Sequence, residues 1–273
     1  MENKVIDYSE YVEIAEGVFW VGFADESAGV HCNSYLIVDG EEAVLIDGGS
    51  RNDFSTVMLK IMRTGTNPHN ISRLIYHHYD PDLCGNIPHM ETVISNKDLK
   101  IISQRENNVF IEYYSPRSPK LCIVELGFVY EFANGRRLEF IRTPYSHSAG
   151  SFVTYDTKTK TLFSSDIFGS YDADWNLYTE IDEGCSDCQP NNPCPVDGKL
   201  CEITGIWDFH RRVMPSTKAL KYAIKMIENL DISLIAPQHG SILHTPESRK
   251  AVIKQLKSMD SVGIEYYLKE NNS

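Results

Sequence analysis

Short apolar runs recur along the 273-residue chain, and several of them end directly in histidine or aspartate. Runs of this length, rich in β-branched and aromatic residues, predict buried strands. Between them lie stretches whose apolar residues have helical spacing. The order of these elements predicts helices packed outside two sheets, an αββα sandwich of the α/β (α+β) class. The predicted strands are residues 18–21, 34–38, 43–46, 74–76, 91–95, 128–132, 138–142, 151–155, 161–164 and 234–236.

Four helices are predicted between these strands, over residues 54–63, 98–104 and 216–230 and from residue 245 onward. Ser216 and Thr245 stand at the start of two of them, where a side-chain oxygen accepts an N–H group of the first turn. No linker or internal repeat divides the chain. We therefore expect one domain over residues 1–273, with a polar tail at residues 269–273.

The charge balance limits the partners that we expect. Asp and Glu number 38 against 26 Lys and Arg, which gives a net charge of −12 with histidine neutral. Such a surface repels nucleic acids and anionic lipid headgroups. No apolar run reaches the roughly 18–20 residues that cross a bilayer, and residues 1–7 lack the basic and apolar segments of a signal peptide. The expectation is a cytoplasmic protein with no nucleic-acid and no membrane partner.

Three histidines and three aspartates follow predicted strands closely. Loops at strand ends of one rigid scaffold can converge. Three imidazoles and three carboxylates are enough donors for two divalent metals that share one bridging carboxylate. A single histidine of this kind is as readily a structural residue, but six such residues at strand ends favour a metal site. These residues are His78, Asp80, Asp82, His147, Asp166 and His239.

This set resembles the ligands of the flavodiiron proteins, the di-iron branch of the metallo-β-lactamase fold. That family carries a His-x-Glu-x-Asp-His motif followed by His, Asp and His. In this chain aspartate stands in place of the glutamate, at Asp80, and 18 residues separate His147 from Asp166. Residues 33–37 (Asn-Ser-Tyr-Leu-Ile) and 45–49 (Leu-Ile-Asp-Gly-Gly) also resemble the opening strands of the family.

Two features depart from the family pattern. Leu83 stands where the first motif ends in histidine, and no segment matches the flavodoxin domain that binds FMN in flavodiiron enzymes. The resemblance covers roughly residues 15–265 and is therefore best to the single-domain oxygen-binding di-iron proteins. It implies two non-haem irons with an oxo, hydroxo or peroxo bridge, no FMN domain, and an O2 sensor in bacterial signalling such as chemotaxis.

The resemblance also implies how the ligands divide between the metals. Zinc hydrolases of the same fold usually have a second histidine where Asp80 stands, so this residue favours iron, although zinc also binds such ligands. The implied first metal is held by His78, Asp80 and His147, the second by Asp82 and His239, and the bridge is Asp166.

Four further residues are candidates for the surroundings of the metals. Asp47 is expected either to orient a ligand histidine or to be a turn residue. His31, just before a matched strand, could approach an open metal position. Tyr79 flanks His78 and is expected mainly to pack, and Leu83 is expected to form an apolar wall beside the second metal.

Four of the seven cysteines lie close together in a segment rich in Pro, Asn, Asp and Gly. In a reducing compartment such a cluster favours metal over disulfides. We expect an irregular insertion over residues 182–204 whose thiolates bind either a structural zinc or an iron–sulfur cluster that relays electrons. These residues are Cys185, Cys188, Cys194 and Cys201.

Three functions remain open from the sequence. The first is an O2 sensor with a signalling protein as partner. The second is an O2 or NO reductase core fed by a separate electron donor. The third and least favoured is a metallo-hydrolase with an altered motif. Because flavodiiron proteins pair head to tail, the resemblance also implies a homodimer.

Overall fold

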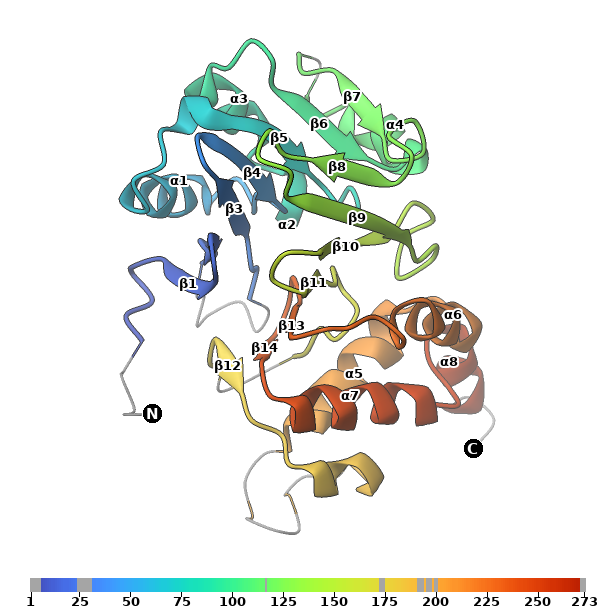
Figure 1. Cartoon of the computed structure of the whole chain (residues 1–273). Coiled ribbons are helices and arrows are strands. Elements are labelled where there is room, and N and C mark those ends of the chain that lie inside the picture. The colour runs from blue at the N-terminus through green and yellow to red at the C-terminus, as the bar shows by residue number, and fades with distance from the viewer. Residues whose placement is uncertain are drawn as a thin grey trace.

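The computed structural model describes residues 6–23, 31–115, 117–171, 175–190, 194, 198 and 201–270 (Figure 1). These residues form two seven-stranded sheets with one apolar core between them and one outside each sheet, where helices pack. Figure 1 shows α5, α6, α7 and α8 gathered on one side of the molecule, whereas α1, α3 and α4 accompany the first sheet. The predicted αββα sandwich is confirmed.

The first sheet contains the N-terminal strands in chain order. Strands β1 to β4 pair antiparallel, and β4 to β7 pair parallel. Gly40 has φ +65° in the turn from β3 to β4, a conformation that glycine adopts without steric penalty. The strands are β1 (Val12–Ala15), β2 (Val18–Trp20), β3 (Tyr35–Asp39), β4 (Glu42–Ile46), β5 (Ile71–Ile75), β6 (Lys100–Ser103) and β7 (Lys120–Cys122).

The second sheet has the order β12-β14-β13-β11-β10-β9-β8. Its β8 to β11 form an antiparallel meander, and β11 then pairs parallel with β13. That parallel pair brings two distant chain segments to the same sheet edge. The strands are β8 (Val129–Glu131), β9 (Arg137–Arg142), β10 (Phe152–Asp156), β11 (Thr161–Phe163), β12 (Tyr178–Thr179), β13 (Leu234–Ala236) and β14 (Ile242–Leu243).

Alternating side chains on the strands separate the inner core from the outer ones. On β3, Tyr35 and Ile37 belong to the core between the sheets, together with Phe152 and Phe163 of the second sheet. Leu36, between them in sequence, packs instead in the outer core with α1 and α3. This period of two is the expected pattern for strands buried on both faces.

Helices cover the two outer faces. In the first half the elements are α1 (Phe54–Arg63), the 3-10 turn η1 (Pro68–Asn70), α2 (Pro81–Cys84), α3 (Ile87–Ile94) and α4 (Arg105–Ile111). In the second half they are the 3-10 turn η2 (Glu183–Asp187), α5 (Glu202–Val213), α6 (Thr217–Ile227), α7 (Pro246–Ser258) and α8 (Ile264–Glu270).

The caps predicted for α6 and α7 are confirmed. The Ser216 hydroxyl accepts the Ala219 N–H at 3.3 Å, and the Thr245 hydroxyl accepts the Ser248 N–H at 3.1 Å. The helix expected over residues 54–63 is α1, with the same bounds.

Two neighbouring predictions are wrong, and α5 was not predicted at all. The strand expected at residues 91–95 lies in α3, because Ile87, Met90, Glu91 and Ile94 form one buried helical face that starts at residues before the predicted strand. Residues 98–104, where a helix was expected, instead contain β6, a parallel strand between β5 and β7. Central parallel strands lack polar alternation, so their pattern is easily taken for a helix.

The insertion and the tail also differ in detail from their predicted limits. The insertion contains η2, and its last three residues belong with the start of α5. Lys269 and Glu270 of the expected tail close α8, and residues 271–273 lie outside the described residues. Among the described helices, none is long and apolar enough to cross a membrane.

Candidate metal centre

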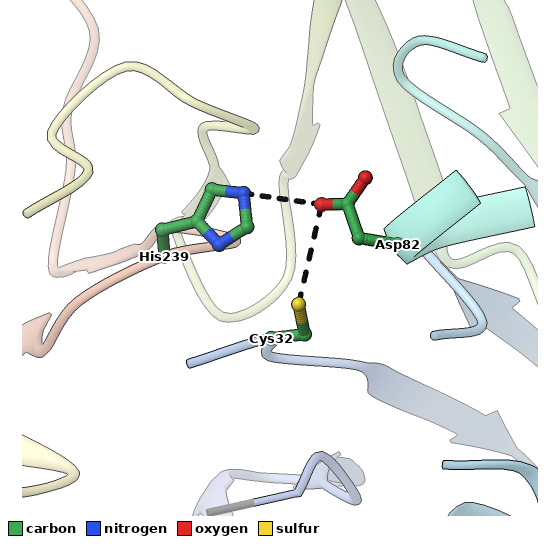
Figure 2. Close-up of side chains that lie close together, drawn as sticks. All are labelled: Cys32, Asp82 and His239. Carbon is green, nitrogen blue, oxygen red and sulfur yellow. Dashed lines mark hydrogen bonds and ion pairs between the residues drawn. The ribbon is translucent and has the colours of Figure 1, made fainter. Parts of the chain in front are cut away.

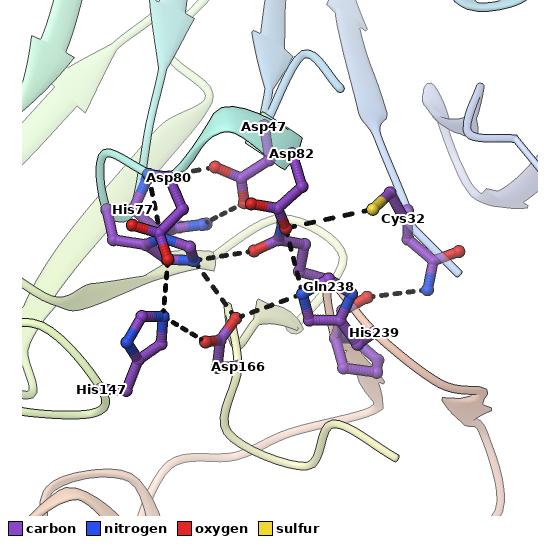
Figure 3. Close-up of polar contacts among 12 residues, drawn as sticks. Cys32, Asp47, His77, Asp80, Asp82, His147, Asp166, Gln238 and His239 are labelled. Atoms are coloured by element: carbon purple, nitrogen blue, oxygen red, sulfur yellow. Dashed lines mark hydrogen bonds and ion pairs between the residues drawn. The ribbon is translucent and has the colours of Figure 1, made fainter. Parts of the chain in front are cut away.

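A cleft of about 580 Å³ opens where strand ends of the two sheets meet. Three of the six predicted ligands each lie three residues beyond a strand: His78 after β5, Asp166 after β11 and His239 after β13. His147 lies in the loop from β9 to β10, and Asp80 and Asp82 lie at the start of α2. All six line the cleft, and Figure 3 shows five of them, Asp80, Asp82, His147, Asp166 and His239, in one cluster.

The first group of donors consists of His78, His147 and Asp166, whose ligand atoms all lie within 4.8 Å of one another. The His147 Nε2 atom is 2.8 Å from Asp166 Oδ2 and 3.3 Å from Asp80 Oδ2. The His78 Nε2 atom is 3.2 Å from Asp166 Oδ1. Two imidazoles and two carboxylates therefore converge on this half of the cleft.

The second group consists of Cys32, Asp82 and His239, also within 4.8 Å (Figure 2). The His239 Nε2 atom is 3.2 Å from Asp82 Oδ2, and Cys32 Sγ is 4.0 Å from the same oxygen. The sequence prediction did not include Cys32. Its one signal was its place directly before the strand motif that begins at Asn33.

Asp166 stands between the two groups. Its Oδ2 faces His147, whereas its Oδ1 faces His78 and lies 3.8 Å from His239 Nε2. The side chain is almost fully buried. A carboxylate whose oxygens face both groups has the geometry that a bridging ligand needs.

Opposite charges inside the cleft shift its pKa values strongly. Burial alone lowers the pKa of His147, but hydrogen bonds to Asp166 and Asp80 outweigh it and raise the pKa to about 10. Burial raises the pKa of Asp166, but His78 and His147 outweigh it and hold that pKa well below its usual range. The metal-free cleft thus pairs imidazolium ions with carboxylates.

The other ligands follow the same pattern. Burial opposes the charged form of His78, yet Asp166 raises its pKa, and burial likewise opposes His239, whose pKa Asp82 raises well above the usual value. The pKa of Asp82 is lowered because His239 outweighs its burial. Since histidine binds a metal as the neutral imidazole and not as imidazolium, metal binding here releases protons.

Gln238 is a second cleft residue that the sequence prediction missed. Its Oε1 is 3.0 Å from His78 Nε2, and its Nε2 donates to Asp82 Oδ2 at 2.8 Å. The amide therefore links the two groups of donors. Its one sequence signal was its position directly before His239.

Asp47 agrees with the turn-residue alternative, since it follows β4 directly with φ +50°, whereas His31 differs from its prediction. Asp47 contacts His77 rather than a ligand histidine: the Oδ2 atom is 2.6 Å from His77 Nδ1, and Oδ1 accepts the His77 N–H at 3.1 Å. His31 does not line the cleft with its ring, which stacks on Trp175 at 4.4 Å. Its carbonyl oxygen instead lies 2.9 Å from His239 Nδ1 and orients that imidazole.

Leu83 and Tyr79 lie away from the cleft. Leu83 is wholly buried in the outer core of the first sheet, so it is not an apolar wall beside the second metal position. It points away because one turn of α2 carries Asp82 and Leu83 on different faces. Tyr79 stacks on Phe110 at 4.4 Å, which agrees with its expected packing role.

His210 positions the segment that carries Asp166. Burial lowers the pKa of His210 to about 4, so its ring is neutral at neutral pH. Its Nδ1 lies 2.7 Å from the Ile206 carbonyl oxygen, and its Nε2 accepts the Phe168 N–H at 3.2 Å. A residue of α5 thus fixes the chain two residues after Asp166.

The four clustered cysteines lie outside the cleft. Among the described residues, the groups of donors within 4.8 Å are the two in the cleft, and neither contains these four. Burial is the main cause that raises the pKa of Cys185, and the other three thiols raise it further. The four cysteines therefore lie near one another. A metal at Cys185, Cys188, Cys194 and Cys201 stays a prediction.

The donors in the cleft fit two divalent metals. Each group offers imidazole nitrogen and carboxylate oxygen on buried or half-buried, hydrogen-bonded side chains, and the buried Asp166 of the first group also lies 3.8 Å from His239 of the second. Nitrogen and oxygen donors of this kind suit iron, manganese or zinc.

The family model described as ODP family beta lactamase matches residues 30–240. This range contains all six predicted ligands together with Cys32. The chain belongs to this family. The ODP family match agrees with the two-sheet sandwich of this chain.

Two curated relatives are longer than this ODP family chain. An uncharacterized protein of Methanocaldococcus jannaschii is 30% identical over 242 residues, which are 85% of this chain and 56% of that protein. The anaerobic nitric oxide reductase flavorubredoxin of Enterobacter sp. is 26% identical over 248 residues, 84% of this chain and 47% of that protein. The chain spans about half the length of these relatives.

A solved structure of similar size has the same fold. It is described as the peroxy diiron species of chemotaxis sensor ODP, and it superposes with a TM-score of 0.75 at 24% identity. The match covers 96% of this chain and 99% of that one.

Proposed function

We propose that this chain holds two non-haem irons in the cleft, binds O2 there and acts as an oxygen sensor. The observation that supports this most is the division of the donors into two adjacent groups that share Asp166. Membership of the ODP family and the likeness to a chemotaxis sensor add support for O2 as the ligand and for signalling as the outcome.

The chain itself would hold the irons and shape their surroundings. His78, Asp80, His147 and the shared Asp166 would bind the first iron, and Asp82 and His239 would bind the second with Asp166. These residues would thereby hold a ferrous pair, which when bound would supply the electrons for reversible O2 binding.

The cleft walls control access of water and protons. Phe23, Phe209 and Val213 line the cleft with apolar side chains, and Phe209 lies 5.5 Å from the His239 ring between centroids. Tyr171 also lines it, so its phenol is a potential hydrogen-bond donor for a bound ligand. The apolar side chains on this part of the wall would slow proton delivery from that side, which favours retention of bound O2 over its reduction.

A reductase is the second candidate, because the flavorubredoxin relative is named as a nitric oxide reductase. In that case the cleft would turn over O2 or NO with electrons from a separate donor protein. The two proposals share the metal site and differ in whether reductant drives continued consumption.

The experiment that separates them uses protein loaded anaerobically with ferrous iron. A sensor is expected to show an absorption change that saturates at one O2 for each pair of irons, with little further consumption when reductant is added. Sustained consumption of O2 or NO with reductant would support the reductase. Iron-free protein that holds zinc and hydrolyses esters would overturn both.

We also propose that the sensor forms a homodimer and reports to a signalling protein. The support is the family resemblance of the ligand motif. Light scattering tests the dimer, and affinity capture that depends on O2 tests the partner; a monomer that captures the same proteins with and without O2 would contradict this part.

A further inference from the structure

We propose that the Cys32 thiolate is a ligand of the second metal position, together with Asp82, His239 and the shared Asp166. This inference rests on the proposed metal function of the cleft and adds a sulfur donor to it. Figure 2 shows the three side chains, from separate parts of the chain, directed at one point.

The second metal position has fewer His and Asp donors than the first. The first position has His78, His147 and Asp80 beside the shared Asp166. Without Cys32, the second position has only Asp82 and His239 beside Asp166. Leu83 cannot add to them, because its side chain has no donor atom and lies in the core.

The distances agree with one metal ion among the three donors. In a tetrahedral site with metal–nitrogen and metal–oxygen bonds near 2.0 Å and a metal–sulfur bond near 2.3 Å, nitrogen and oxygen lie about 3.3 Å apart, and sulfur and oxygen about 3.5 Å apart. The observed separations are 3.2 Å for His239 to Asp82 and 4.0 Å for Cys32 to Asp82. A shift of roughly half an ångström at the sulfur therefore completes the geometry.

The backbone around Cys32 is fixed to the backbone around His239. The Asn33 N–H donates to the Gln238 carbonyl at 2.7 Å, and the Asn33 side chain donates to the carbonyls of Pro237 at 3.0 Å and Gly240 at 2.9 Å. Asn33 Oδ1 in turn accepts the indole N–H of Trp20 at 2.8 Å. Cys32 is thus held next to His239 by buried hydrogen bonds on its own neighbour.

The residue on the other side of Cys32 acts on the same imidazole. The His31 carbonyl is 2.9 Å from His239 Nδ1, so the other ring nitrogen, Nε2, is the one that faces Asp82 and Cys32. Metal-binding histidines commonly have a backbone carbonyl in this outer position. Residues 31–33 therefore orient one ligand and supply another.

Cys84 and Cys122, which are buried, do not have the arrangement of the half-buried Cys32. Cys84 Sγ faces the His78 carbonyl at 3.6 Å, and Cys122 Sγ faces Gln104 Oε1 at 3.3 Å. Cys32 alone among these three lines the cleft.

Coordination by Cys32 has a defined chemical balance. The Sγ–H bond breaks, its proton passes to solvent and the sulfur lone pair forms the bond to the metal, with no change of oxidation state. A thiolate makes the second position softer than the first, so it prefers Fe²⁺ or Zn²⁺ to Mn²⁺ or Mg²⁺.

The test uses the full chain, stripped of metal and reloaded with cadmium, because the NMR shift of bound cadmium reports the number of sulfur ligands. We expect a resonance from a site with one sulfur, distinct from any signal of a site with four. In Cys32→Ser this resonance moves to the range of nitrogen and oxygen ligands, and cadmium affinity there falls by at least about tenfold. Cys122→Ala removes a buried thiol outside the cleft and is the matched control.

A cleft resonance that is the same in Cys32→Ser and the parent chain overturns the inference and leaves the two-metal proposal standing. The lack of any cleft resonance in the parent chain overturns both. Alkylation of the parent chain with iodoacetamide, mapped by peptide mass, provides a readout that needs no variant. Cadmium is expected to slow alkylation of Cys32 at least tenfold, and equal rates with and without cadmium also overturn the inference.

Discussion

Replacing Asp166 by asparagine keeps the volume of the side chain and removes the charge that the two groups of donors share. In the parent protein this carboxylate lies 2.8 Å from His147 and contributes to raising the pKa of that imidazole from 6.5 to about 10. One pKa unit corresponds to about 1.4 kcal/mol, so the protonated His147 stabilises the metal-free fold by about 4–5 kcal/mol at most.

The pH window follows from the direction of this shift. A raised pKa gives stability that is fully present below pH 6.5 and is lost as pH rises through about 10. The free energy of unfolding of the metal-free parent should therefore fall by about 1.4 kcal/mol per unit between roughly pH 7 and pH 9 from His147. His78 and His239, whose pKa values are also raised, add to this loss of stability. The lowered pKa values of Asp166 and Asp82 add no slope there, because both carboxylates stay ionised in folded and unfolded chains.

Urea unfolding of metal-free protein at several pH values measures the slope. In Asp166→Asn we expect about half the parental His147 contribution or less, since only Asp80 remains beside that imidazole. The His78 contribution should also fall, because Asp166 is the main group that raises its pKa, whereas the His239 contribution should largely remain through Asp82. Lys60, whose pKa burial lowers to about 8, titrates in the same window with the opposite sign, but it is common to both proteins and cancels in the difference.

Metal content provides a second readout of the same variant. An amide oxygen cannot bridge two cations as a carboxylate does, so Asp166→Asn should keep at most one metal in the cleft. Asp53→Asn is the matched control: Asp53 also lines the cleft, but its carboxylate accepts the Ser50 N–H at 2.8 Å. If Asp166→Asn binds two metals and its unfolding free energy changes with pH as steeply as in the parent protein, the reasoning is refuted.

Three further predictions concern other parts of the molecule. Leu83→His places an imidazole in a closed core and should lower the free energy of unfolding by about 2–4 kcal/mol, with cleft metal content unchanged; a gain in metal affinity would show that the side chain reaches the cleft. Asn33→Ala removes one of two donors from the Pro237 carbonyl and the acceptor of the buried Trp20 indole N–H. It should lower the unfolding free energy by about 2–4 kcal/mol and weaken the second metal, whereas an unchanged melting temperature would contradict the role of this side chain. Cys185→Ser combined with Cys188→Ser should remove one metal ion per chain by elemental analysis while the cleft keeps its own, and equal metal content would refute a site at the insertion.

The sequence predicted the sandwich because most of its longer strands carry their burial pattern locally. The helix α1 and the caps Ser216 and Thr245 are likewise properties of short segments, and the structure has them where they were expected. The exchange of helix and strand at α3 and β6 arose where the pattern was ambiguous over a few residues and tertiary burial decided the outcome.

The six His and Asp residues of the cleft were predicted because a motif with fixed spacing marks them. Cys32 and Gln238 have no such spacing: Cys32 meets Asp82 across 50 residues, and Gln238 meets Asp82 across 156. Leu83 shows the opposite case. It is adjacent to the ligand Asp82 in sequence and was expected beside the metal, but it lies in the outer core of the first sheet. Contacts of this kind depend on how distant loops are tied together, which a single sequence does not encode locally.

The hydrogen bonds that join Asn33 to Pro237 and Gly240 span 204 and 207 residues. A ribosome adds about 5–20 residues per second, so roughly ten to forty seconds separate the synthesis of the two sides of the second metal position. During that interval the first sheet can collapse, but the imidazole of His239 does not yet exist. Loading of the proposed second metal position therefore has to follow synthesis of residue 239, and a shorter nascent chain would offer that metal no imidazole.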